Sequence, residues 1–169
     1  MPFADSGEIK IFYESEGDGS PLVLHHGLTG SHEGWSKHAN YVDALKDKYQ
    51  LVLIDARGHG RSDKPHAPEK YGMKYMVGDV TAVLDELGIE KAHFWGYSMG
   101  GRIGLATGKY SPERFSSLII GGNGLSEKDS KGEMEELQGY VSILKQGLDA
   151  WLAFLGRKFE DLPDWEKDK

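Results

Sequence analysis

The sequence contains no cysteine, no long apolar run and no excess of basic residues. Without cysteine there are no disulfide bonds, thiolate metal ligands or dithiol redox motifs. The apolar runs are far shorter than the roughly 20 residues that cross a bilayer. The formal net charge of −7 argues against nucleic acid or an anionic membrane as the main partner. What remains is an ordinary globular composition, 38% hydrophobic and 28% charged.

The N-terminal stretch MPFADSGEIK lacks the basic region and apolar core of a signal peptide. We therefore expect a cytoplasmic protein. At 169 residues the chain is long enough for one domain with a buried core.

Short apolar segments predict the strands of a sheet. Residues 8–14 alternate apolar and polar side chains, as in a half-buried antiparallel strand near a sheet edge. Continuous apolar runs, typical of strands buried on both faces, occupy residues 21–25, 51–54, 92–95 and 115–120.

Helical periodicity fills the intervals between these runs. Apolar spacing predicts one helix within 35–49 and a second within 75–87 that stops at Gly88. A third is expected to start at or just after Ser98 and to end before residue 111. Strands and helices that alternate in this way indicate βαβ units, and hence an α/β fold with a mostly parallel sheet.

The composition changes after Gly124. Residues 126–133 are polar and charged, as in a linker or loop. Apolar side chains then recur at spacings of three and four, which predicts two or three amphipathic helices broken near Gly147 and Gly156. We therefore divide the chain into a core, 1–125, and a helical segment, 126–169. This segment either packs as ordinary core or forms a lid or interface that needs a partner surface.

Three glycine clusters follow predicted strands. They are HHGLTG at 25–30, DARGHGRSD at 55–63 and GYSMGG at 96–101. Ligands of open parallel sheets bind outside the carboxyl ends of the strands, so all three clusters are expected at that edge. GYSMGG matches the G-x-S-x-G nucleophile elbow, a sharp turn between a strand and a helix. Gly96 and Gly100 suit this turn because a side chain at either position would clash.

Ser98 stands at the centre of the elbow. A serine that attacks a carbonyl needs a base and hydrogen-bond donors for the oxyanion that forms. The backbone N–H of Met99 can supply one donor, and the segment His26–Gly27–Leu28 is expected to supply the second. Alternatively, Ser98 only caps the helix. The ordered occurrence of all three glycine motifs favours the nucleophile.

Together the three motifs resemble the α/β-hydrolase superfamily, and most of all its esterase, lactonase, haloperoxidase and C–C hydrolase branch. The resemblance runs from about Glu8 to Gly122. It implies an α/β-hydrolase sheet with flanking helices, Ser98 as nucleophile, the backbone amides of Leu28 and Met99 as oxyanion hole, and no cofactor or metal. A serine rather than an aspartate at the elbow disfavours the epoxide hydrolase and haloalkane dehalogenase branches.

Histidine is absent after His93. Members of the superfamily carry the triad in the order serine, acid, histidine, so the expected base is missing downstream of Ser98. We expect structural roles for His25, His26 and His59, a strand position remote from the elbow for His93, and surface or loop positions for His32, His38 and His66. Glu127 and Asp129 are candidate acids, although the superfamily more often places the acid after a seventh strand.

By this resemblance, the last strands, the rest of a helical lid, the acid and the histidine are missing. The chain therefore resembles the N-terminal part of a hydrolase. It is a fragment or truncated product, a protein completed by another chain, or a short protein that has lost the chemistry.

Two classes of function follow. The first is a serine hydrolase of carboxylesterase type, acting by acyl transfer to Ser98 on a small ester or related carbonyl substrate, with an incomplete triad. The second is a catalytically inactive binding or oligomerising module of the same fold. An open sheet edge and apolar helices favour a homo-oligomer or pairing with a missing C-terminal half.

Overall fold

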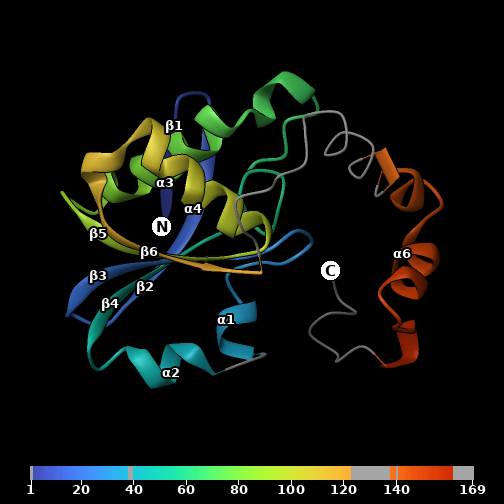
Figure 1. Cartoon of the computed structure of the whole chain (residues 1–169), viewed down its shortest axis with the longest axis horizontal. Coiled ribbons are helices and arrows are strands. Elements are labelled where there is room, and N and C mark those ends of the chain that lie inside the picture. Colours follow the sequence, from blue (N-terminus) through green and yellow to red (C-terminus); the bar gives the residue numbers. More distant parts are fainter. Residues whose placement is uncertain (1, 38–39, 123–137, 140, 162–169) are drawn as a thin grey trace. The chain divides into compact units, whose positions relative to one another are not determined.

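The computed structural model describes residues 2–37, 40–122, 138–139 and 141–161 (Figure 1). The chain divides into two compact units, Met1–Gly124 and Leu125–Lys169.

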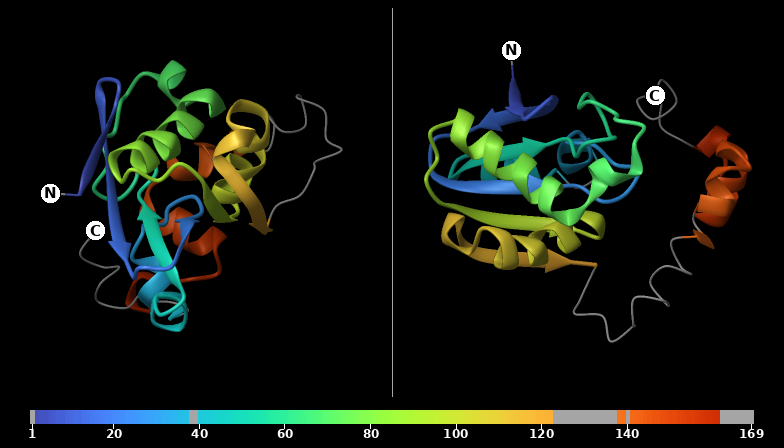
Figure 2. Two further views of the ribbon diagram at one scale, coloured as in Figure 1. Left: turned by 90° about the vertical axis from the view of Figure 1, so that its left-hand side faces the viewer. Right: turned by 90° about the horizontal axis from the view of Figure 1, so that it is seen from above.

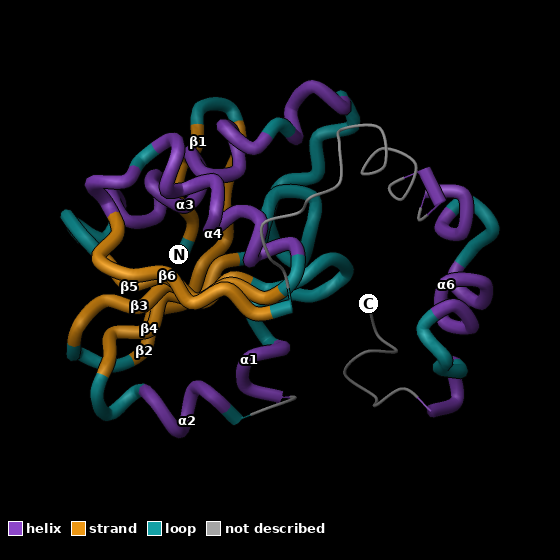
Figure 3. Tube along the Cα trace, viewed as in Figure 1, coloured by secondary structure: helices purple, strands orange, loops and turns teal. Residues whose placement is uncertain are grey.

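A six-stranded sheet forms the centre of the first unit (Figure 3). Its strands are β1 (Phe3–Ser6), β2 (Ile9–Glu16), β3 (Ser20–His25), β4 (Tyr49–Ile54), β5 (Ala92–Tyr97) and β6 (Phe115–Gly121), in the order β1-β2-β4-β3-β5-β6. The strands β4, β3, β5 and β6 run parallel, whereas β1 and β2 are antiparallel additions at one edge. The predicted mostly parallel sheet and its antiparallel edge strand are confirmed.

Helices cover both faces of this sheet. They are α1 (Gly34–Lys37), α2 (Tyr41–Leu45), α3 (Met73–Glu86) and α4 (Met99–Tyr110), with 3₁₀ turns at Pro68–Tyr71 and Pro112–Arg114. Figures 1 and 2 show α3 and α4 on one face and α1 and α2 on the other. Val80 and Ile103 pack with Val23 and Phe94 on the first face, and all four are fully buried. Trp35 anchors the smaller core on the second.

The helix expected within 35–49 is wrong in its extent. Two short helices, α1 and α2, stand in its place, and Tyr49 begins β4 instead of ending a helix. Tyr49 pairs with Ser20 in the parallel register of β3 and β4. Trp35, Val42 and Tyr49 pack in one common core at helical spacing, so the spacing alone concealed that they belong to three separate elements.

β6 is not buried on both faces, contrary to expectation. It is the last strand in the sheet order, and among the described residues only β5 pairs with it (Figure 2). The side chains of Leu118 and Ile119 are 38% and 50% exposed. Their apolar character predicted a strand correctly, but the cover on its faces depends on neighbours that local sequence does not reveal.

In the second unit, residues 138–139 and 141–144 are helical and α6 spans Leu148–Phe154, followed by a 3₁₀ turn at Phe159–Asp161. The predicted breaks are confirmed, because Gly147 (φ 100°) and Gly156 (φ 67°) interrupt the helices. Several large apolar side chains are exposed here: Val141, Leu144, Leu148, Phe154, Leu155 and Phe159. The candidate acids Glu127 and Asp129 lie outside the described residues, as does the whole predicted linker, 126–133. No helix in the described part of the chain is long and apolar enough to span a membrane.

Candidate active site

Ser98 lies between β5 and α4, in a strained backbone conformation. Its φ of 51° and ψ of −112° are rare for a residue with a side chain, and such conformations cost about 1–3 kcal/mol. Ser98 is partly exposed and makes no capping hydrogen bond to α4 with its side chain. The interaction that defines a helix cap is therefore missing, whereas strain of this kind is typical of a nucleophile elbow.

Close backbone contacts explain the glycines of the elbow. A Cβ on Gly96 would lie 2.2 Å from the carbonyl oxygen of Gly100. A Cβ on Gly100 would lie 2.2 Å from the carbonyl oxygen of His25, at the end of β3. The start of α4 thus packs directly on two strand ends, as the sequence predicts, and leaves no room for a methyl group at either position.

The loop after β3 lies against the elbow. A Cβ on Gly27 would lie 3.3 Å from the Cβ atom of Ser98. The N–H of Gly30 donates to the carbonyl of Gly27 over 3.1 Å and closes the turn that presents Leu28. Among the described residues, no hydrogen bond uses the backbone N–H of Leu28 or Met99 as donor. The two expected oxyanion donors therefore belong to segments that meet beside Ser98.

His26 holds this loop in place. Its Nδ1 lies 2.7 Å from the carbonyl oxygen of Gly27, and its Nε2 lies 3.1 Å from the backbone nitrogen of Ala56. An Nε2 that accepts from a backbone N–H carries no proton, so Nδ1 donates to the Gly27 carbonyl. Both ring nitrogens are occupied within the fold, which favours a structural role for His26 over that of a base.

Burial keeps the neighbouring histidines neutral. It lowers the pKa of His25 to about 4 and, with the adjacent His25 ring, that of His26 to about 3. Burial also lowers the pKa of His59, whose ring centroid lies 5.2 Å from that of His26. These rings pack as uncharged groups within and beside the segment His26–Leu28, which is the oxyanion loop expected from the sequence.

His32 was expected at the surface or in a loop; it lies in a turn before α1, but not at the surface. It is buried, and its backbone N–H and Nδ1 lie 2.7 and 2.9 Å from Oδ1 of Asp55. Its Nε2 lies 3.5 Å from the Glu14 carboxylate on β2. The buried carboxylate of Asp55 requires hydrogen-bond donors, and His32 supplies them from a buried position. Exposed His66 agrees with expectation, and His38 lies outside the described residues.

The glycine-rich turn after β4 is built as a structural support. Burial alone would raise the pKa of Asp55, but hydrogen bonds from His32 and Arg61 outweigh burial and lower it. Nε and Nη2 of Arg57 each lie 2.6 Å from an oxygen of the Asp79 carboxylate in α3. Both partners of this two-pronged ion pair are buried, so the turn is tied to the main core.

The sequence analysis missed Tyr97 and the end of β6. The backbone N–H of Ser98 donates to the carbonyl of Gly121 over 2.8 Å. The ring of Tyr97 lies between Gly27 and Gly122, because a Cβ added to Gly27 would lie close to Cδ1 of the ring and one added to Gly122 would lie close to Cε2. The glycine pair at 121–122 was the available signal, because consecutive glycines at a strand end often mark a close approach.

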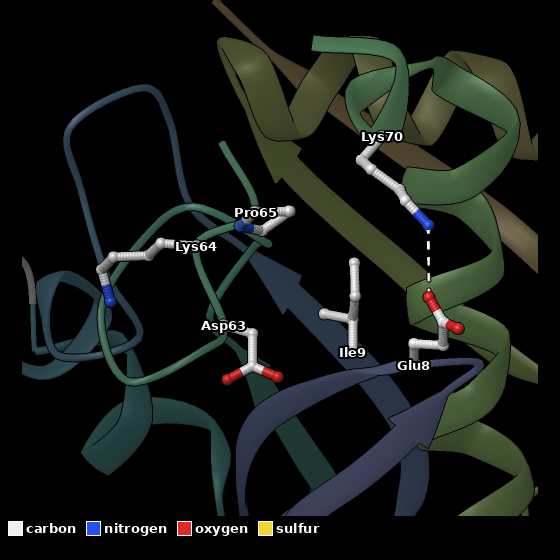
Figure 4. A pocket seen from close by; sticks show the side chains of 6 residues that line it. All are labelled: Glu8, Ile9, Asp63, Lys64, Pro65 and Lys70. Atoms are coloured by element: carbon white, nitrogen blue, oxygen red, sulfur yellow. Dashed lines mark hydrogen bonds and ion pairs between the residues drawn. The ribbon is translucent and has the colours of Figure 1, made fainter. Parts of the chain in front are cut away.

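A cavity of 370 Å³ has no elbow residue in its lining (Figure 4). It is lined by Glu8, Ile9, Asp63, Lys64, Pro65 and Lys70. Its charges are already engaged: Lys70 lies 3.5 Å from Glu8, Lys64 donates to the Gly60 carbonyl, and Asp63 accepts from the backbone of Lys10. No cluster of three metal-ligating side chains occurs among the residues that the structure describes.

Comparison with known proteins supports the fold described above. Residues 20–148 match the family described as alpha/beta hydrolase fold. The chain belongs to this α/β-hydrolase family. It is 32% identical over 152 residues to 3-oxoadipate enol-lactonase 1 of Acinetobacter baylyi, covering 87% of this chain and 52% of the relative. It is 32% identical over 111 residues to epoxide hydrolase 3 of Siraitia grosvenorii, covering 66% and 34%.

Among solved structures, the enol-lactonase from Burkholderia xenovorans LB400 matches with a TM-score of 0.65 and 30% identity. The match covers 70% of this α/β-hydrolase chain and 45% of the lactonase. The chain spans only part of the length of the curated relatives it matches, from 57% of one of them down to 30% of another.

The buried histidines predict a loss of stability in acid. His25, His26 and His59 resist protonation in the folded state, whereas in the unfolded chain they bind protons below about pH 6.5. The free energy of unfolding should be insensitive to these groups above that pH. Below it, stability should fall towards pH 4 by up to about 1.4 kcal/mol per pH unit for each of His25 and His26, and His59 should add to the loss.

Urea unfolding between pH 7.5 and 4.5 measures this slope. His25→Phe keeps a ring against Phe94 and should reduce the slope, while His66→Gln, at an exposed position, should leave it unchanged. Equal slopes in all three proteins would show that the buried histidines do not control the acid response.

Proposed function

We propose that the chain carries the nucleophilic half of a serine hydrolase of carboxylesterase type, which transfers the acyl group of a small ester or related carbonyl substrate to Ser98. The observation that carries the proposal is the strained conformation of Ser98 at the end of β5, with the loop of Gly27 packed beside it. Family membership and the similarity to enol-lactonases, which by name act on a cyclic ester, support the same chemistry.

In the proposed reaction, Oγ of Ser98 attacks the substrate carbonyl carbon and the carbonyl oxygen becomes an oxyanion. When the carbonyl forms again, the ester C–O bond breaks, the acyl group stays on Oγ, and the alcohol leaves with the proton that Ser98 has given up. The backbone N–H groups of Leu28 and Met99 donate to that oxygen, and each such donor is worth about 3–4 kcal/mol of barrier. The similarity to an epoxide hydrolase does not decide the chemistry, because Ser98 replaces the carboxylate that the resemblance implies for that branch.

The proton of Ser98 needs an acceptor. His26 is engaged at both nitrogens, and the sequence has no histidine after His93. We propose that the triad histidine comes from a segment outside these 169 residues, and that the acid comes from the same segment or from this chain. Downstream candidates Glu127 and Asp129 remain proposals for the acid.

Covalent capture by an aryl trifluoromethyl ketone tests the nucleophile. This ketone forms a tetrahedral adduct with an oriented serine, and its ¹⁹F resonance reports the adduct without turnover. The adduct should form with the wild-type chain and with Ser116→Ala, which changes an exposed serine on β6. Ser98→Ala should abolish it. Equal adduct formation in Ser98→Ala would refute the proposal.

The open edge of β6 favours a second function, that of an oligomerising module. The strand FSSLIIG carries no charge or proline, the features by which natural edge strands avoid pairing. Within the described part of the chain no strand pairs with its outer backbone groups, and Ile119 is exposed, so a second copy or a further segment of the protein could pair there.

Size exclusion with light scattering over a tenfold dilution tests self-association, and we expect species above 18.8 kDa. Ile119→Lys places a charge on the exposed edge and should shift the population towards monomer. A monomer that is indifferent to dilution would contradict the oligomer, and association unaffected by Ile119→Lys would exclude this edge.

A further inference from the structure

We propose that Tyr97 is a positioning residue, whose ring sets the spacing between the oxyanion loop and the nucleophile elbow and is itself held by the end of β6. The proposal rests on the proposed role of Ser98. Tyr97 immediately precedes the nucleophile, and the proposed triad chemistry assigns no role to its side chain.

One edge of the ring lies against the oxyanion loop. A Cβ on Gly27 would lie 3.3 Å from Cδ1 of Tyr97, 3.4 Å from the Tyr97 carbonyl oxygen and 3.3 Å from the Cβ atom of Ser98. A side chain at position 27 would therefore meet the ring and the elbow at once, so both lie close to Gly27. Leu28, whose N–H is the expected oxyanion donor, is the next residue in the chain.

The opposite edge of the ring lies against the turn after β6. A Cβ on Gly122 would lie 2.8 Å from Cε2 of Tyr97, and one on Gly121 would lie 3.5 Å from Cδ2. The carbonyl of Gly121 also accepts the backbone N–H of Ser98 over 2.8 Å. The end of β6 thus holds both the nucleophile's backbone and the ring that precedes it.

The ring is 58% exposed, so core burial does not account for its position. Among the described residues, no hydrogen bond uses its hydroxyl. What the ring does is fill the space between two glycine segments that come from different strands, β3 and β6. Oxyanion donors must lie at hydrogen-bond distance, about 2.7–3.1 Å, from the oxygen that develops the negative charge. A spacer that prevents Gly27 from shifting therefore controls whether the Leu28 N–H reaches the oxyanion.

Two glycines provide a matched pair of variants. Gly122 has a φ of 62° and contacts the ring, whereas Gly7, in the turn between β1 and β2, has a φ of 65° and no atom within 4 Å of an added Cβ. Gly122→Ala and Gly7→Ala introduce the same left-handed backbone strain. Only Gly122→Ala pushes the ring towards Gly27.

The affinity of the trifluoromethyl ketone for Ser98, measured by ¹⁹F NMR beside a thermal melt of each variant, tests the proposal. Tyr97→Ala and Gly122→Ala should each weaken the adduct at least tenfold. Tyr97→Phe, which keeps the ring, should match the wild type. Gly7→Ala should lower the melting temperature without changing adduct affinity. In Tyr97→Ala/Gly122→Ala the losses should not add, because the methyl group no longer meets a ring.

The outcomes separate the two proposals. A wild-type chain without a Ser98-dependent adduct refutes the role of Ser98. A Ser98-dependent adduct that Tyr97→Ala leaves unchanged refutes the spacer alone. Equal weakening by Gly122→Ala and Gly7→Ala would reduce the effect to general stability, and equal weakening by Tyr97→Phe and Tyr97→Ala would assign it to the hydroxyl. If Gly122→Ala does not fold, the Tyr97 pair still decides.

Discussion

The 169-residue chain is expected to hydrolyse p-nitrophenyl acetate at or near the background rate. Ser98 has its elbow and the N–H groups of Leu28 and Met99 beside it, but no histidine follows in the sequence, and both nitrogens of His26 are engaged. Loss of the triad base typically removes about four to six orders of magnitude in turnover, and the remainder comes from the oxyanion hole and binding.

Initial rates of wild type and Ser98→Ala at equal concentration measure this, with the uncatalysed reaction as reference. The two proteins should differ little, even though the trifluoromethyl ketone adduct distinguishes them. A full-sized turnover that Ser98→Ala abolishes would contradict the prediction. It would mean that an upstream histidine or a second copy supplies the base, and His59→Ala would be the first variant to separate those cases.

Gly100→Ala is expected to destabilise the fold by about 3 kcal/mol or more, since overpacking against rigid atoms lies at the severe end of single substitutions. The new Cβ would lie 2.2 Å from the carbonyl oxygen of His25 and 2.8 Å from that of His26. Both are backbone atoms at the end of β3, so neither can move without displacing the oxyanion loop.

Gly108→Ala in the same helix is the matched control. Nothing lies within 4 Å of a Cβ at Gly108, and alanine in a helix interior gains about 0.5–1 kcal/mol over glycine. Urea unfolding should therefore move the two variants in opposite directions from the wild type. Similar stability of Gly100→Ala and Gly108→Ala would show that α4 does not press on β3 as the structure indicates.

The local pattern of apolar residues was sufficient to predict the strands of the core. The apolar runs that became β3, β4 and β5 are continuous because these strands have helices or loops over both faces, and burial on both faces leaves a direct trace in composition. The turn at GYSMGG could likewise be predicted from local sequence, because Gly96 and Gly100 are required by contacts within a few residues of Ser98 and with the adjacent strand end.

The sequence by itself therefore determined the α/β class, the parallel strands, the position of Ser98 at a strand-to-helix turn and the absence of a downstream histidine. Only the tertiary structure decided that His32 is buried against Asp55, that β6 is an exposed edge and that the Tyr97 ring lies between Gly27 and Gly122. Secondary structure follows from the periodicity of neighbouring residues, which a sequence displays. Burial and contact depend on which distant segments meet, and residues 27, 97 and 122 become neighbours only when three strands end at the same edge of the sheet.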